Sequence, residues 1–265
     1  MPVIKRGAVQ VHYDDVGSGP CLILGHSFLC SGEMWRNQID DLARNHRVLN
    51  VDFRGHGGSS RIEHSFSLYD LVDDLVAVLD HAGVEKAVWA GLSVGGMVAM
   101  RAALRVPERV SGLVLIDSHS GAERAVKVFK YRAMSLGTRL VGLRPFVPAI
   151  LPLMFGRSTM RGNATLVGEW KERFAALHPS SIRTFLKALN ARDSVTGMLS
   201  DLSVPTLVVV GEEDASLPPR CSEVIASAIP GARLEVIPRA GHLSALEQPE
   251  AVTRVIGEFL AAFSL

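Results

Sequence analysis

A serine between glycines, at the turn from a strand into a helix, constrains this chain more than any other feature. An apolar run from Val88 leads to Gly91-Leu-Ser-Val-Gly95, and a helix-compatible run continues to Arg105. Glycine has no Cβ, so the strand and helix backbones can approach closely around such a turn. The turn lifts the serine clear of the sheet and leaves the next amide at a helix N-terminus. The pattern predicts Ser93 as a nucleophile and the Val94 N–H as an oxyanion donor.

Strand-like and helix-like stretches alternate on both sides of this turn. Alternation of this kind predicts an α/β fold, with a mostly parallel sheet covered by helices on both faces and functional groups at the carboxyl ends of the strands. The sequence predicts an edge strand over 8–16 and further strands over 21–24, 47–52, 110–117, 204–211 and 232–237. It predicts helices over 33–44, 67–82, 220–228 and 249–263.

The alternation stops between residues 118 and 202, where helix-like stretches are broken by glycine and proline. We therefore expect a core formed by 1–117 and 203–265, with 118–202 inserted as a helical cap before the last two strands. The stretch 140–155 is more apolar than a solvated helix. Either it lines a substrate pocket or it simply packs on the core. For a pocket, the candidate lining residues are Leu140, Phe146, Leu153 and Met154.

A serine nucleophile requires a base that takes its proton and an acid that orients the base. Asp214 and His242 each follow a predicted strand, so both are expected at the same sheet edge as Ser93. The order Ser, Asp, His is also that of hydrolases with a serine at such a turn. Taken singly, the histidine could be a surface group and the acidic cluster a solvated turn. Asp117 is a competing orienting acid and Glu213 a weaker one.

These motifs together resemble those of the α/β-hydrolase superfamily, over nearly the whole chain. Besides the serine turn, Asp52-Phe-Arg-Gly-His-Gly-Gly-Ser59 resembles the family's D-x-R-G-x-G-x-S loop, and the segments ending at Asp214 and His242 resemble its acid and histidine loops. By this resemblance, His26-Ser-Phe28 matches the oxyanion loop, with the Phe28 amide as the second donor. Ser27 stands where the family usually has glycine, so a positive φ there would be strained, or its hydroxyl would add a polar contact.

Composition gives no support for several classes of partner. The 265-residue chain has a formal net charge of +1, which gives no reason to expect nucleic acid or an anionic membrane. Its three cysteines fit neither a disulfide framework nor a zinc site. No signal segment or apolar run of about 18 residues is present, which favours a cytoplasmic protein without a membrane span. We expect a small-molecule substrate, no metal and no organic cofactor.

The combined pattern predicts a serine carboxylic ester hydrolase that acts through an acyl-enzyme, with His242 as general base and acid. Among relatives it resembles small carboxylesterases and the 3-oxoadipate enol-lactonase-like group. An enol-lactone acid would need a cationic anchor, for which Arg132, Arg139 and Arg144 are candidates. A C–C bond hydrolase, an acyltransferase or a perhydrolase would keep the same three residues. A ligand receptor on this fold is the alternative from another class, and multiple-turnover hydrolysis separates it from an enzyme.

Overall fold

The computed structural model describes the whole chain except residues 1, 124, 127, 130–136, 139–140 and 263–265. Its centre is an eight-stranded sheet in the order β1-β2-β4-β3-β5-β6-β7-β8. Along the sheet from β4 to β8 neighbouring strands are parallel, whereas β2 pairs antiparallel with both β1 and β4, so the predicted α/β fold with a mostly parallel sheet is confirmed. The strands are β1 (Val3–Arg6), β2 (Val9–Gly17), β3 (Cys21–Gly25), β4 (Arg47–Val51), β5 (Ala87–Leu92), β6 (Val110–Ile116), β7 (Thr206–Gly211) and β8 (Arg233–Ile237).

The expectation of an edge strand over residues 8–16 is wrong. Strand β2 pairs with β1 on one side and with β4 on the other, and β1 is the edge. The alternation of apolar and polar side chains in β2 indicates only that one face of the sheet is solvated there. That pattern carries no information about whether a strand has a second hydrogen-bonding neighbour.

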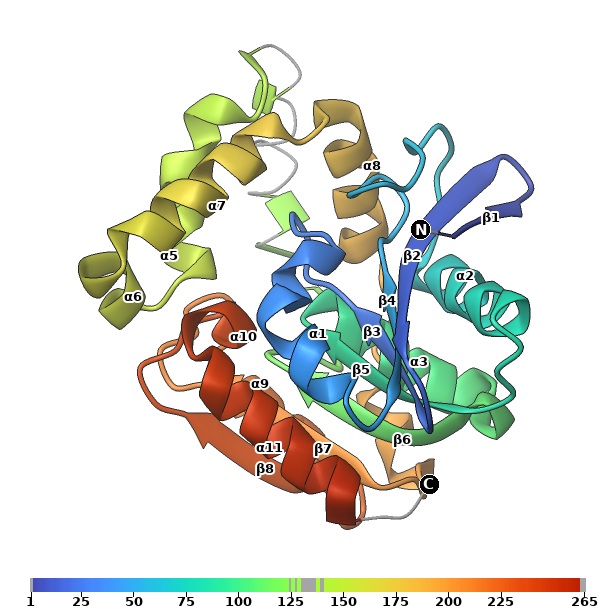
Figure 1. Ribbon diagram of the computed structural model, residues 1–265. Coiled ribbons are helices and arrows are strands. Elements are labelled where there is room, and N and C mark those ends of the chain that lie inside the picture. The colour runs from blue at the N-terminus through green and yellow to red at the C-terminus, as the bar shows by residue number, and fades with distance from the viewer. Residues whose placement is uncertain (1, 124, 127, 130–136, 139–140, 263–265) are drawn as a thin grey trace.

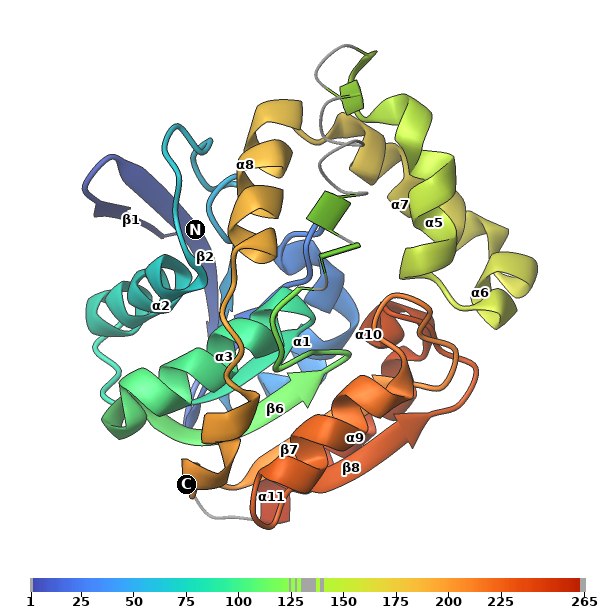
Figure 2. The same ribbon diagram turned by 180° about the vertical axis from the view of Figure 1, so that it is seen from behind.

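Helices cover both faces of the sheet (Figures 1 and 2). One face carries α1 (Arg36–Leu42) and α11 (Pro249–Ala262), and the other carries α2 (Leu68–His81), α3 (Val94–Arg105) and α9 (Pro219–Ala228). Each face has its own apolar cluster. Leu22 and Leu24 of β3 belong to the first cluster and Ile23 to the second, because successive strand residues point to opposite faces.

Helix α2 shows how local sequence sets the bounds of an element. Ser67, the predicted N-cap, forms a capping box with Asp70, in which each side chain accepts the other residue's backbone N–H. Such a cap stabilises a helix by about 1 kcal/mol. At the other end Gly83 has φ 68°, a conformation that glycine adopts without strain and that stops the helix.

Between β6 and β7 the described chain is mainly helical, and the helices lie beyond the carboxyl ends of the strands, with α5, α6 and α7 at the upper left of Figure 1 and α8 at the top. They are the short turn η3 (Arg144–Phe146), α5 (Val147–Met154), α6 (Arg157–Gly162), α7 (Ala164–Ala176) and α8 (Pro179–Asn190). We propose that 118–202 is a separate cap and call it the cap below. No helix in the described ranges is long and apolar enough to cross a membrane.

The cap is attached to the core by ion pairs on one side. Arg36 of α1 pairs with Glu169 of α7, and Arg173 of α7 pairs with Glu33 and with Glu169. These side chains are about one-third to one-half exposed, so each pair contributes at most about 1 kcal/mol. The remaining short elements are η1 (Gly32–Trp35), η2 (Pro107–Arg109) and α10 (Ser244–Glu247) in the core and η4 (Thr196–Asp201) at the end of the cap.

Candidate active site

Ser93 lies at the turn between β5 and α3 in a strained backbone conformation. Its φ of 57° and ψ of −110° fall in a region that a residue with a side chain rarely adopts, at a cost of about 1–3 kcal/mol. Two hydrogen bonds hold this conformation. The Ser93 N–H donates to the Ile116 carbonyl at 2.8 Å, and the Ser118 hydroxyl donates to the Ser93 carbonyl at 2.8 Å. The neighbouring strand β6 therefore fixes the turn.

The glycines around Ser93 are required by close backbone contacts. A Cβ on Gly91 would lie 2.2 Å from the carbonyl carbon of Gly95, and a Cβ on Gly95 would lie 2.2 Å from the carbonyl oxygen of Gly25. Neither contact is sterically possible, because both involve backbone atoms rather than a side chain that could move. The close approach of strand and helix at Gly91 and Gly95 was predicted from sequence, whereas the direct backbone contact of the turn with Gly25 at the end of β3 was not.

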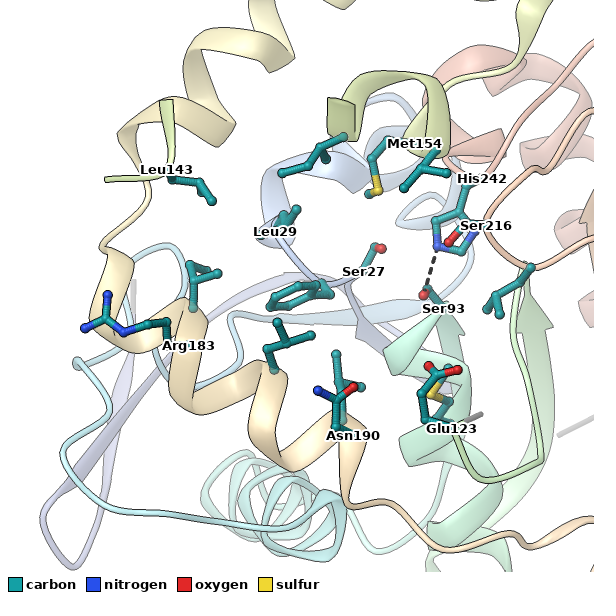
Figure 3. A pocket seen from close by; sticks show the side chains of 18 of the residues that line it. Ser27, Leu29, Ser93, Glu123, Leu143, Met154, Arg183, Asn190, Ser216 and His242 are labelled. Carbon is teal, nitrogen blue, oxygen red and sulfur yellow. Dashed lines mark hydrogen bonds between the residues drawn. The ribbon is translucent and has the colours of Figure 1, made fainter. Parts of the chain in front are cut away.

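The three residues predicted for acyl transfer are joined by hydrogen bonds. His242 Nε2 lies 3.0 Å from Ser93 Oγ, and His242 Nδ1 lies 2.8 Å from Asp214 Oδ2. The second carboxylate oxygen of Asp214 accepts the N–H groups of Ser216 and Leu217 at 2.8 and 2.9 Å, which fixes its direction. Because an ionised Asp214 can only accept a hydrogen bond, the proton of the neutral imidazole lies on Nδ1. This leaves Nε2 free to accept the Ser93 O–H (Figure 3).

The two competing acids have other partners. Asp117 is fully buried and accepts the Gly211 N–H at 2.7 Å through one oxygen, and the Ser244 O–H and N–H through the other. Burial and the nearby Asp214 carboxylate raise the pKa of Asp117 well above its usual value. Glu213 accepts the N–H and O–H of Ser158 in the cap, both at 2.7 Å. The orienting contact to His242 comes from Asp214.

The charge of His242 is set by opposing effects. Burial disfavours the imidazolium, but the carboxylates of Asp214, Asp117 and Glu247 favour it, and the net result is a pKa raised above 6.5. A histidine poised in this range can accept a proton from a hydroxyl and return it to a leaving group.

The Phe28 amide is oriented by a buried histidine. His26 Nδ1 donates to the Ser27 carbonyl at 2.7 Å, and His26 Nε2 accepts the Phe53 N–H at 2.9 Å. A trans peptide directs its C=O and N–H to opposite sides, so the bond to the Ser27 carbonyl turns the Phe28 N–H away from His26. Burial lowers the pKa of His26 to about 4, which keeps this tautomer neutral.

Neither proposed oxyanion donor is used elsewhere in the described chain. The N–H groups of Phe28 and Val94 have no protein acceptor among the described residues, and the Val94 N–H belongs to the first turn of α3, where helices leave donors unpaired. Phe28 also lines the same cavity as Ser93. Both N–H groups are therefore available to a bound ligand.

Of the two alternatives for Ser27, a strained positive φ or an added polar contact of the hydroxyl, neither is seen among the described residues. Positive φ in this loop falls at Leu29, with φ 68°, and Ser27 is not among the described non-glycine residues with positive φ. Ser27 is fully buried, and its hydroxyl has no hydrogen-bond partner among the described residues. Its backbone N–H donates to the Met34 sulfur at 3.2 Å. A serine at position 27 therefore causes no backbone strain.

A cavity of about 310 Å³ opens above Ser93 and His242, between the core and the cap (Figure 3). Its volume lies at the lower end of the range for small-molecule sites. Most of its wall is apolar and comes from the cap, with Leu143, Ile150, Leu153, Met154, Ile182 and Leu186. Leu153 and Met154 were predicted to line it. Phe146 does not, because it packs against the apolar cluster beneath the cap, and Leu140 lies outside the described residues.

Charged side chains in the cavity wall were not predicted from sequence. Arg192 pairs with Glu123 at 3.1 Å, and Arg183 of α8 points away from Ser93 (Figure 3). Nothing in their local sequence distinguishes them from solvated residues. Of the suggested carboxylate anchors, Arg144 is exposed and pairs with Glu172 at 2.7 Å, while Arg132 and Arg139 lie outside the described residues. In the described part of the chain, no cluster of three His, Cys, Asp or Glu side chains could hold a metal ion.

Comparison with known proteins agrees with this geometry. Residues 20–249 match the family model described as alpha/beta hydrolase fold. A putative carbamate hydrolase from Azorhizobium caulinodans is 29% identical, over 99% of this chain and 98% of the relative. A thermophilic esterase from Thermogutta terrifontis is 32% identical with a TM-score of 0.92, covering 96% of this chain and 94% of that one.

An enol-lactonase from Burkholderia xenovorans is also similar in structure. It has a TM-score of 0.91 at 25% identity, covering 98% of this chain and 100% of that one. The matches support hydrolase activity on small molecules. They divide between esterase, enol-lactonase and carbamate hydrolase, so they do not select one substrate class. The chain belongs to the family with the α/β-hydrolase fold.

Proposed function

We propose that this protein hydrolyses carboxylic esters of small to medium apolar acids through an acyl-enzyme on Ser93. The supporting observation is the hydrogen-bonded series Ser93, His242, Asp214 at the floor of a mainly apolar cavity. An acyl chain placed in that cavity would bring its carbonyl carbon next to Ser93 Oγ. No described arginine in the wall is turned toward Ser93 as a free cation, which favours an uncharged acyl chain over a free carboxylate.

Acylation begins when Ser93 Oγ attacks the ester carbonyl carbon while His242 Nε2 takes the serine proton. The carbonyl π electrons move to oxygen, and the resulting oxyanion accepts the N–H groups of Phe28 and Val94. Each such donor contributes on the order of 3 kcal/mol to the transition state. Asp214 stabilises the imidazolium. Collapse of the intermediate breaks the bond to the alcohol oxygen, and that oxygen receives the proton from His242.

Deacylation repeats these steps with water. His242 Nε2 takes a proton from the water as its oxygen attacks the acyl carbon, and the same two amides hold the oxyanion. The bond from the acyl carbon to Ser93 Oγ then breaks, and Ser93 regains its proton from His242. The products are the carboxylic acid and the free enzyme. Every proton is accounted for by Ser93, His242 and water.

The test is hydrolysis of p-nitrophenyl esters of increasing acyl length by the wild type and by Ser93→Ala. The variant should lose activity by several orders of magnitude while its far-UV circular dichroism and Tm stay near those of the wild type. Ser222→Ala is the matched control, because Ser222 is equally buried but lies on α9 outside the cavity wall. Its rates should equal those of the wild type.

The ester assay, extended to other substrates and to a binding measurement, separates the alternative functions. Activity retained by Ser93→Ala would refute its role as nucleophile. A wild type that is inactive on every ester but active on lactones or carbamates would move the substrate class toward that of the enol-lactonase or carbamate hydrolase relatives. Ligand protection against heating without turnover would instead favour a receptor.

A further inference from the structure

Glu247 makes an unusual set of contacts around the loop of His242. One carboxylate oxygen accepts the N–H groups of Gly241 and Leu243, at 2.9 and 3.2 Å, and these residues flank His242 on both sides. The other oxygen accepts the N–H of Gly156 at 2.8 Å, and Gly156 lies in the cap. A single side chain therefore holds the histidine loop and a turn of the cap together.

Backbone contacts reinforce this junction. The Leu243 N–H also donates to the Met154 carbonyl at 3.0 Å, and the Met154 side chain lines the cavity. A Cβ on Gly241 would lie 2.1 Å from the Gly156 nitrogen, so the two loops are in direct backbone contact. The wall of the cavity and the base are consequently parts of one hydrogen-bonded unit, which Glu247 connects.

We propose that Glu247 is a positioning residue that fixes the loop of His242 against the cap wall of the acyl cavity. It touches neither substrate nor reacting atoms and acts through His242. This inference rests on the proposed esterase function for its kinetic consequences. The placement and the ionisation of His242 can both be measured without turnover.

Two properties of His242 depend on Glu247. The first is position, because a displacement of about 1 Å between a base and its nucleophile costs on the order of 100-fold in rate. The second is charge. The Glu247 carboxylate raises the pKa of His242, together with Asp214 and Asp117. A residue that only stabilised the fold would affect neither the imidazole pKa nor kcat at temperatures where the variant is folded.

Glu247→Gln is the informative variant, because glutamine keeps the size but places an NH₂ group against backbone donors. We expect kcat to fall about 10- to 100-fold with KM within threefold, and the pKa of His242 to fall. The matched control is Glu169→Gln, which removes a cap-to-core ion pair far from His242 and should leave kcat and this pKa unchanged. NMR titration of labelled histidine measures the pKa without substrate.

The outcomes separate the two proposals. A lower His242 pKa in Glu247→Gln supports the effect of Glu247 on the charge of His242 even if the wild type hydrolyses no ester, in which case only the proposed function fails. Wild-type kcat and an unchanged His242 pKa in Glu247→Gln would overturn the positioning role. Should Glu247→Gln not fold, Glu247→Asp keeps the charge but is too short to reach both loops. A wild-type kcat in that variant would overturn the role as well.

Discussion

Two buried aspartates follow the neighbouring strands β6 and β7, and they differ in their hydrogen-bond partners. Asp214 directs one oxygen at the His242 ring and has the other fixed by two backbone N–H groups. Asp117 accepts one N–H from Gly211 and two donors from Ser244, so it joins the acid loop to the segment that follows His242. At the scale of single residues, contact with the imidazole decides which aspartate orients it.

Replacement of the two aspartates should therefore have unequal effects. Asp214→Asn should lower kcat by about 10³- to 10⁴-fold, because an amide no longer enforces the productive imidazole tautomer. Asp117→Asn should lower kcat by less than about tenfold, since it keeps an acceptor and removes a carboxyl whose ionisation burial opposes. Steady-state kinetics with one ester measure both. A larger loss in Asp117→Asn would move the orienting role to that residue.

The pH dependence of activity follows from the raised pKa of His242. Only neutral imidazole can take the serine proton, so kcat/KM should fall as pH drops through this pKa. Because the net effect of burial and the nearby carboxylates raises the pKa above 6.5, the acid limb should have its midpoint above pH 6.5. Profiles of kcat/KM between pH 5 and 9 give that midpoint. A midpoint below 6.5 would mean that burial outweighs the carboxylates.

At the scale of elements, the turn of Ser93 is defined by backbone contact between β3, β5 and α3. Because Gly25, Gly91 and Gly95 have no side chain, the end of β3 can reach the first turn of α3. The loop that carries Phe28 follows β3 directly, and Val94 begins α3. One proposed oxyanion donor therefore lies in α3 itself, and the other lies in a loop that starts at the end of β3, which is in backbone contact with α3.

Gly95→Ala should disrupt this arrangement. The added Cβ would meet a backbone oxygen at 2.2 Å, which forces β3 and α3 apart, so we expect a loss of stability of more than about 3 kcal/mol together with loss of activity. Gly168→Ala is the control, because Gly168 lies in α7 with no atom within 4 Å of the new Cβ. It should stabilise the protein by about 0.5–1 kcal/mol. Urea unfolding of both variants compares the two effects.

Considered as a whole molecule, the core contains a pair of buried histidines, of which His26 lies in the loop that carries Phe28. His26 and His56 are both buried, with ring centroids 5.1 Å apart. Burial lowers the pKa of His26 to about 4, and burial together with the neighbouring His26 lowers that of His56 to about 3. Both must gain a proton on unfolding at mildly acidic pH, so the unfolded chain binds more protons there than the folded protein.

These histidines should make the fold acid-sensitive. Their contribution to stability is complete above pH 6.5 and is lost as pH falls toward 4, by on the order of 3 kcal/mol for each histidine. His56→Leu should reduce this pH dependence, whereas replacement of the exposed His64 by leucine should not. Denaturant unfolding at pH 7 and pH 5 provides the comparison. Equal pH dependence in wild type and His56→Leu would contradict the assignment.

Sequence predicted those features that depend on local pattern. Periodicity and capping located α2, and strand-end motifs placed Ser93, Asp214 and His242 at one sheet edge, where the structure brings them together. Features that depend on tertiary neighbours were missed. The pairing of β2 on both sides, the packing of Phe146 against an apolar cluster and the pair of Glu123 with Arg192 all require knowledge of which distant segments meet.

The junction of residues 154–156 with residues 241–243 has a practical consequence for recombination between relatives. A chimera cut at the ends of the inserted segment would exchange the carbonyl of Met154 and the close-packed Gly156 along with the cavity wall. The host protein would then receive the other relative's residues 154–156 as contacts for its own histidine loop. A crossover placed after residue 162, where α6 ends, leaves the host's own contacts in place, so that α7 and α8 can be exchanged without disturbing the loop of His242.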